Sequence, residues 1–313
     1  MKKAIFIFFY TLSCTILVAQ DWASYTTSMS DIPFDKVNSL SIGPSGEIWI
    51  GNDVSGNYYH ASCYVNNSWS GHLVSNWVND LATDNSGNLW LSTWGELRKW
   101  DGNSWTTYTP PGSSLGFWAA PVCAQSSGIV WLLDYSSLWK FDGSIWEEFT
   151  TTNSGLPSTS ISQIISYGNT LYIATSDHGL VYYENGSWSE YNTSNSNIPD
   201  DALLAVSAGN NGIWVVCQSG ELAKLQNGNF VSYSCAGLNL TKDMASDAAG
   251  NIWIATHGAG IIKYDGIDFT IFDNSSGGIF DQYNQYLSIE VDASNTVWVG
   301  SRTAGLLYFD QTQ

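Results

Sequence analysis

Residues 86–108 read SGNLWLSTWGELRKWDGNSWTTY, and this stretch decides the fold because its pattern recurs along the chain. It contains a turn, a strand centred on a tryptophan, a glycine turn, a second strand, an Asp-Gly turn and an aromatic strand. The same frame places aromatic residues at Trp49, Trp90, Trp131, Tyr172, Trp214, Trp253 and Trp298. A period of roughly forty residues made of strands and turns is typical of a β-propeller, whose blades stack around a ring.

The last strand of each copy carries a pair of aromatic residues spaced by three. The clearest pairs are Trp105/Tyr108, Trp146/Phe149, Trp188/Tyr191, Phe230/Tyr233 and Phe269/Phe272, with Trp69/His72 as a weaker member. The seventh copy has no such pair, but residues 21–26, DWASYT, carry Trp22 and Tyr25 at the same spacing. We therefore predict an all-β, seven-bladed β-propeller with four-stranded antiparallel blades, in which residues 21–26 complete the last blade and leave no unfinished edge.

The first twenty residues, MKKAIFIFFYTLSCTILVAQ, combine two lysines with a short apolar run. This pattern predicts a secretory signal peptide over residues 1–20, followed by a single propeller domain over residues 21–313. A lipoprotein anchored at Cys14 is disfavoured because Thr11 stands where an aliphatic residue is expected. No later stretch approaches the roughly 20 apolar residues of a membrane helix. We expect a secreted or periplasmic protein without membrane insertion.

The charge balance is strongly acidic. Beyond residue 20 the chain has 8 basic and 28 acidic residues, because Lys2 and Lys3 belong to the signal segment. Nucleic acid is excluded as a partner, since its binding depends on Lys and Arg that neutralise phosphates. The same argument excludes anionic lipid surfaces. The acidic balance favours a soluble monomer.

Four cysteines follow the signal segment: Cys63, Cys123, Cys217 and Cys235. They occupy different strand positions and lack the spacing of a disulfide framework or a zinc site. A bridge between Cys217 and Cys235, which fall in one copy, stays open. We expect no metal and no cofactor.

Residues 78–102 contain V-N-x-L, D-x-x-G-N-L-W-L-S-T and G-x-L-x-K-W-D-G in succession, and residues 243–266 read DMASDAAGNIWIATHGAGIIKYDG. These segments resemble the two-component regulator propeller repeat. That family occurs mainly in periplasmic sensor regions of bacterial hybrid histidine kinases and also in secreted proteins. The resemblance implies a propeller fold and a sensing or binding role, with a membrane sensor or surface protein as a candidate partner. It implies no particular ligand.

Catalysis has few candidate residues. His178 and His257 lie in turns after the second strand of their copies, and a lone loop histidine is more often a turn residue than a catalyst. A secreted hydrolase or lyase that uses either histidine with an acid such as Asp177 is the alternative function. Residues 83–90, TDNSGNLW, resemble a sialidase Asp-box, but the chain has only Arg98 and Arg302 where a sialidase needs three arginines. We predict no catalytic residue.

Candidate binding residues lie outside the repeated aromatic positions. Four aromatic residues belong to the loops of the second and third copies: Trp77, Trp94, Trp118 and Tyr135. Flat aromatic faces suit stacking on sugars or docking of peptides, although aromatic residues are also often packed in the core. Trp94, beside Gly95, is the best candidate for exposure. Three polar residues near the starts of inner strands are expected to line the central channel or to hold water there: Asn38, Asn79 and Ser162.

From these observations we predict a secreted, non-catalytic binding or sensing module. Its expected ligand is a glycan or a peptide, bound by the aromatic loop residues and the channel mouth, with His178 and His257 on the same face.

Overall fold

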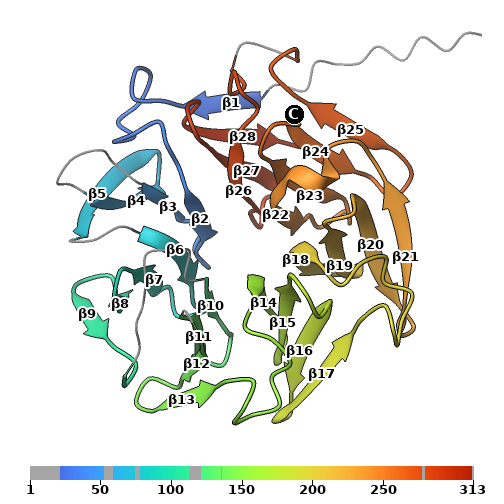
Figure 1. The fold of residues 1–313 in the computed structure, drawn as a ribbon. Coiled ribbons are helices and arrows are strands. Elements are labelled where there is room, and N and C mark those ends of the chain that lie inside the picture. Colours follow the sequence, from blue (N-terminus) through green and yellow to red (C-terminus); the bar gives the residue numbers. More distant parts are fainter. Residues whose placement is uncertain are drawn as a thin grey trace, which may run out of the picture.

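The computed structural model describes residues 22–52, 59–74, 78–112, 121–134, 136–276 and 279–311. Within these ranges the strands form seven four-stranded antiparallel sheets, arranged as blades in a ring (Figure 1). The prediction of an all-β seven-bladed propeller is confirmed. A single turn of 3-10 helix, η1 (Leu238–Leu240), accompanies the described strands. None of the described segments forms an apolar helix of membrane-spanning length. The predicted signal peptide lies outside the described residues.

Each blade runs from an inner strand beside the channel to an outer strand at the circumference. The inner strands are β2 (Ser39–Ile42), β6 (Val78–Thr83), β10 (Val122–Ala124), β14 (Ile161–Tyr167), β18 (Leu203–Gly209), β22 (Thr241–Ser246) and β26 (Tyr286–Val291). The second strands are β3 (Ile48–Asn52), β7 (Leu89–Thr93), β11 (Val130–Leu133), β15 (Thr170–Thr175), β19 (Gly212–Cys217), β23 (Ile252–Thr256) and β27 (Thr296–Ser301).

The third and outer strands complete the blades. The third strands are β4 (Tyr59–Val65), β8 (Glu96–Trp100), β12 (Leu138–Phe141), β16 (Leu180–Glu184), β20 (Glu221–Gln226), β24 (Ile261–Tyr264) and β28 (Leu306–Asp310). The outer strands are β5 (Ser68–Val74), β9 (Trp105–Tyr108), β13 (Trp146–Phe149), β17 (Ser187–Tyr191), β21 (Asn229–Ser234), β25 (Phe269–Phe272) and β1 (Trp22–Tyr25). We call the face that carries the turns after the second strands and the loops after the outer strands the upper face.

Ring closure follows the prediction from the N-terminal aromatic pair. The first described strand, β1, pairs antiparallel with β28, so it is the outer strand of blade seven. Trp22 lies opposite Phe309 in this pair, and their rings stack with centroids 5.2 Å apart. The N-terminal strand therefore closes the ring and covers the edge that β28 would otherwise expose.

The repeated tryptophans of the second strands form the core between blades, as predicted. Trp90 is buried and meets Phe141 of blade three edge-to-face, with the ring centroids 6.2 Å apart. The Lys99 ammonium group lies 5.3 Å from the centroid of the same indole ring. Blades three, five and six repeat this lysine-over-tryptophan contact. A positive charge over an aromatic face is favourable, so the lysines cover the buried tryptophan row.

An aspartate in the first turn of three blades holds the core tryptophan. Asp84 accepts hydrogen bonds from the Trp90 indole nitrogen at 2.8 Å and from the main-chain nitrogens of Ser86 and Asn88. Asp247 with Trp253 and Asp292 with Trp298 repeat the indole contact, both at 2.9 Å. The Asp-box-like segment is therefore a structural turn that orients a core side chain.

Blades one, three and five lack this aspartate. Gly43 and Gln125 occupy its place in blades one and three, and in blade five the hairpin is shorter. Among the described residues, the indole nitrogens of Trp49, Trp131 and Trp214 have no hydrogen-bond partner. The aspartate thus explains which tryptophans are anchored.

Replacing Asp84 by alanine is expected to lower the free energy of unfolding by about 2 kcal/mol, because hydrogen bonds to a charged group are lost and buried donors are left unpaired. Urea denaturation checks this value. Gln125→Ala, at the same turn position of blade three, is the matched control and should change the stability much less. Equal losses in the two variants would show that the Asp84 hydrogen bonds do not stabilise the blade.

The four described cysteines are free thiols, so the bridge left open between Cys217 and Cys235 is not formed. Cys63, Cys123 and Cys217 are buried among apolar side chains. They act as small core residues.

Candidate functional site

Trp94 lies on the upper face, in the turn between β7 and β8. Its side chain is 46% exposed, which is high for tryptophan and agrees with its predicted position at a turn apex. Trp77, Trp118 and Tyr135 lie outside the described residues, so their place on the same rim stays a prediction. Of these four predicted rim residues, Trp94 is the one that the structure describes.

The central channel is a cavity of about 560 Å³ lined by the inner strands of all seven blades. Asn38, Asn79 and Ser162 contribute to its wall, at the positions expected from the sequence. The Ser162 hydroxyl donates a hydrogen bond of 2.8 Å to the Leu203 carbonyl of the next blade, so it joins two blades. The Asn79 side-chain nitrogen is buried and has no hydrogen-bond partner among the described residues.

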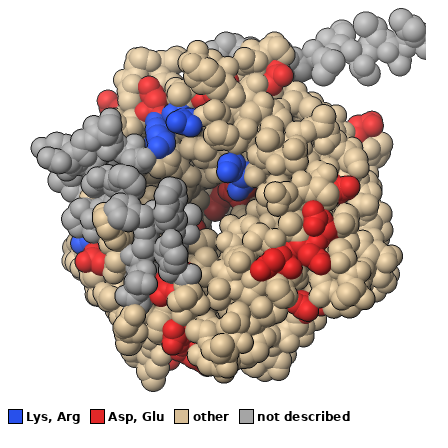
Figure 2. All heavy atoms as spheres, viewed as in Figure 1, with Lys and Arg blue, Asp and Glu red and all other residues tan. Residues whose placement is uncertain are grey.

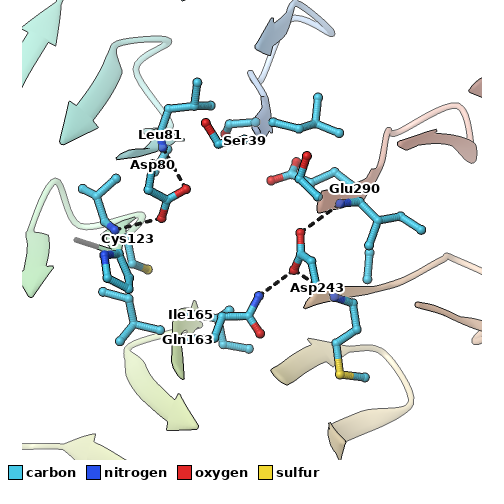
Figure 3. A pocket seen from close by; sticks show the side chains of 18 of the residues that line it. Ser39, Asp80, Leu81, Cys123, Gln163, Ile165, Asp243 and Glu290 are labelled. Carbon is cyan, nitrogen blue, oxygen red and sulfur yellow. Dashed lines mark hydrogen bonds between the residues drawn. The ribbon is translucent and has the colours of Figure 1, made fainter. Parts of the chain in front are cut away.

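Three acidic side chains project into the channel from the inner strands, together with one amide (Figure 3). They are Asp80, Asp243, Glu290 and Gln163. Asp80 accepts a hydrogen bond of 3.0 Å from the main-chain nitrogen of Val122 in the next blade. Asp243 accepts one of 2.9 Å from Ile289, and Glu290 accepts one of 3.0 Å from Ile42. Inner strands are sheet edges with unpaired N–H groups. These carboxylates bind such groups and join blade two to three, blade six to seven and blade seven to one.

Gln163 joins three blades. Its side-chain oxygen accepts a hydrogen bond of 2.8 Å from the Val206 nitrogen in blade five. Its side-chain nitrogen donates one of 2.6 Å to Asp243 in blade six. Blade five carries the small residue Ala205 at the corresponding position. This leaves room for the Gln163 side chain to reach Asp243 in blade six.

The channel raises the pKa of all three carboxyl groups. Burial away from water is the main cause, and it raises the pKa of Asp80 to about 7 and that of Asp243 to about 6. Burial likewise raises the pKa of Glu290 to about 8, with the negative charge of Asp243 adding to the effect. The backbone donors act in the opposite direction but do not outweigh burial. These carboxyl groups of the channel therefore hold protons near neutral pH.

These channel carboxyl groups were not among the residues predicted from the sequence. The available signal was an acid at the inner-strand position where blades one and seven have Ser39 and Ser288. An alignment of the inner strands would have separated Asp80 and Asp243 from that small-residue pattern.

His178 and His257 lie in upper-face turns of blades four and six, with blade five between them. The His178 ring nitrogen Nδ1 is 3.1 Å from a carboxylate oxygen of Asp177, but the two atoms do not have hydrogen-bond geometry. Both side chains of this pair are more than two fifths exposed. A general base needs a carboxylate that orients it and a site that excludes water. His178 and Asp177 therefore lack the arrangement that the alternative function, a histidine-acid catalyst, requires.

In the described ranges, no three His, Cys, Asp or Glu side chains are placed to hold a metal ion. Two features suit a ligand: the exposed indole of Trp94 in the turn between β7 and β8, and the polar residues Asn38 and Asn79 on the channel wall.

The sequence matches one family model. Residues 72–95, which include β7 and the turn with Trp94, match the model described as two component regulator propeller. The repeat predicted from the sequence is thus present in blade two. A comparison with curated proteins found no match.

Several solved structures share the fold. An extracellular domain from B. thetaiotaomicron, named for a hybrid two component system, has a TM-score of 0.71 and 19% identity, covering 93% of this chain and 40% of its own length. PorZ, a surface component of the type-IX secretion system of Porphyromonas gingivalis, has a TM-score of 0.71 and 14% identity, covering 89% of this chain and 47% of its own. YCF48 bound to D1 peptide has a TM-score of 0.66 and 12% identity, covering 92% and 96%.

This chain spans less than half the length of the first two structures. At these identities the likeness shows the fold alone.

Proposed function

Because the chain carries a two-component regulator propeller repeat within a seven-bladed ring, we propose that it is a sensing or binding module that acts outside the cytoplasmic membrane. Its ligand is a glycan or a peptide, which it binds without chemical change. The extracellular domain named for a two component system and the secretion-system surface component among the structural neighbours support this location and role.

The observation that carries the proposal is the exposed indole of Trp94 on the upper face, in the turn between β7 and β8. The aromatic ring of Trp90, by contrast, is buried in the core of blade two. A tryptophan left half-exposed on a soluble protein suits a sugar ring or an apolar peptide side chain, since either removes apolar surface from water. The proposed partner is a membrane sensor or another surface protein that recognises the ligand-bound propeller.

Replacing Trp94 by alanine is expected to weaken ligand binding at least about tenfold, the usual effect of removing an aromatic anchor from an interface. A glycan array and an immobilised peptide library identify the ligand, and calorimetry with the strongest binder measures the change. Ile267→Ala is the matched control, because Ile267 is 83% exposed but lies in the turn between β24 and β25, away from the upper face. Equal binding by the wild-type and Trp94→Ala proteins would contradict the proposed site.

A further inference from the structure

The basic residues of this acidic protein are unevenly distributed. Five of the eight in the described ranges lie on third strands, with their charged groups no more than 6.0 Å from an aromatic ring centroid: Arg98, Lys99, Lys140, Lys224 and Lys263. The other three, Lys36, Lys242 and Arg302, belong to upper-face segments of blades one, six and seven. Figure 2 shows basic side chains beside the mouth of the channel, with acidic side chains inside it. Positive charge thus collects on neighbouring blades of one face.

Main-chain hydrogen bonds join the segments that carry these three cations. Lys242 lines the cavity just after Leu240, whose carbonyl accepts a bond of 2.9 Å from His257. His257 pairs with Gln285 in an isolated antiparallel bridge, and Gln285 accepts a bond of 3.0 Å from the Arg302 nitrogen.

The connection continues into blade one. The Val37 nitrogen donates a hydrogen bond of 2.8 Å to the Ser301 carbonyl, which places Lys36 in the segment beside Arg302. We call Lys36, Lys242, His257, Gln285 and Arg302 the basic ridge.

Arg302 is held in place on this ridge. Its guanidinium group donates a hydrogen bond of 3.1 Å to the Gln285 side-chain oxygen. Gln285 is fixed in turn by its main-chain nitrogen, which donates to the Asp281 carboxylate at 3.2 Å. Asp281 is buried, and its oxygens also accept bonds from the Tyr283 nitrogen and the Thr303 hydroxyl. The carboxylate behind the ridge is therefore engaged by internal donors, while Arg302 itself is exposed.

We infer that the basic ridge binds the carboxylate groups of an acidic oligosaccharide, an inference that rests on the proposed binding function and specifies its ligand. Arginine and lysine bind carboxylates by charge-assisted hydrogen bonds, and an oriented guanidinium group favours planar anions. A chain with a formal net charge of −18 repels anions from a distance, so an acidic ligand needs a local positive site. Trp94 lies on blade two, next to blade one, and offers the flat face that suits a sugar ring better than a peptide backbone.

The test uses tetragalacturonate as the acidic probe and maltotetraose as the neutral probe, both measured by calorimetry on the whole chain. Lys242→Gln and Arg302→Gln are each expected to weaken tetragalacturonate binding about tenfold, the loss of one charge-assisted contact. Lys263→Gln is the matched control, because it removes the same charge from β24, where the ammonium lies 5.0 Å from the Trp253 ring centroid. Binding to the wild-type protein should also weaken as salt is raised, since the two tested cations, Lys242 and Arg302, are exposed.

Unchanged tetragalacturonate binding in both ridge variants, with intact thermal unfolding, overturns the inference. Equal affinity for maltotetraose that depends on Trp94 also overturns it, but leaves the proposed binding function standing. The same holds if only a peptide with a free carboxyl terminus binds and its amidated form does not. If sugars and peptides all fail to bind, the proposed function fails together with the inference.

Discussion

The Trp22→Ala variant is expected to unfold with a free energy about 4 kcal/mol below that of the wild type, within the range for removing a buried tryptophan. Trp22 is only 8% exposed although it lies on an outer strand. Its ring meets Trp253 at 6.1 Å, Phe272 at 5.6 Å and Phe280 at 5.7 Å between centroids, in addition to the stacked Phe309. The substitution removes the contacts that hold β1 against β28 of blade seven and against blade six, so it weakens the closure of the ring.

Urea denaturation followed by circular dichroism measures this loss, and limited proteolysis near β1 reports the opened edge. Trp105→Ala is the control, because Trp105 has the matching position on β9 but belongs to a blade whose strands are continuous in sequence. It is half-buried, and its loss is expected to cost about 1–2 kcal/mol. Similar values for the two variants would show that ring closure adds nothing to the stability.

The Glu290→Gln variant is expected to be more stable than the wild type at pH 9 and to gain much less at pH 5. The folded protein raises the pKa of Glu290 to about 8, whereas the unfolded chain has a value near 4.3. The folded state therefore binds more protons between these values, and the contribution of Glu290 to stability is fully present below about pH 4 and lost as the pH rises through 8. Glutamine has no charge to desolvate, and its side-chain oxygen still accepts the hydrogen bond from Ile42.

One unit of pKa shift corresponds to about 1.4 kcal/mol, so a gain of at least about 1.4 kcal/mol is expected at pH 9. Asp80 and Asp243 have raised pKa values in the same channel, and the wild-type protein should likewise lose stability from pH 5 to pH 9. Urea denaturation at the two pH values measures both effects. Glu147→Gln, on the exposed outer strand β13, is the control and should change stability by no more than about 0.5 kcal/mol at either pH. A Glu290→Gln protein that is less stable at pH 9 would contradict the raised pKa.

The sequence predicted those features that every blade repeats. The tryptophan series and the aromatic pairs recur because each blade needs the same wedge of core, and Trp22 with Tyr25 revealed the closing strand for the same reason. A repeated pattern averages over seven copies, so local exceptions such as the shorter hairpin of blade five do not obscure it.

The ionisable and amide side chains of the channel were not predicted from the sequence, because they occur at positions that differ from blade to blade. Asp80, Gln163 and Asp243 stand far apart in the chain, and only the closed ring brings them to one cavity. Asn38, Asn79 and Ser162 were located correctly on its wall, but the main-chain acceptor of Ser162 belongs to another blade. The role of Asp84 as a tryptophan anchor likewise needed the indole position, which the motif alone does not give.

The pairing of β1 with β28 fixes the order in which the molecule is completed. The ribosome makes β1 before any other described strand and β28 after all the rest, so the partner that covers β28 must wait, unpaired, through the synthesis of six and a half blades. Such a nascent chain presents an open edge and an uncovered aromatic surface until β28 emerges. Closure of the ring is therefore a late step, and the early strand has to avoid pairing elsewhere until then.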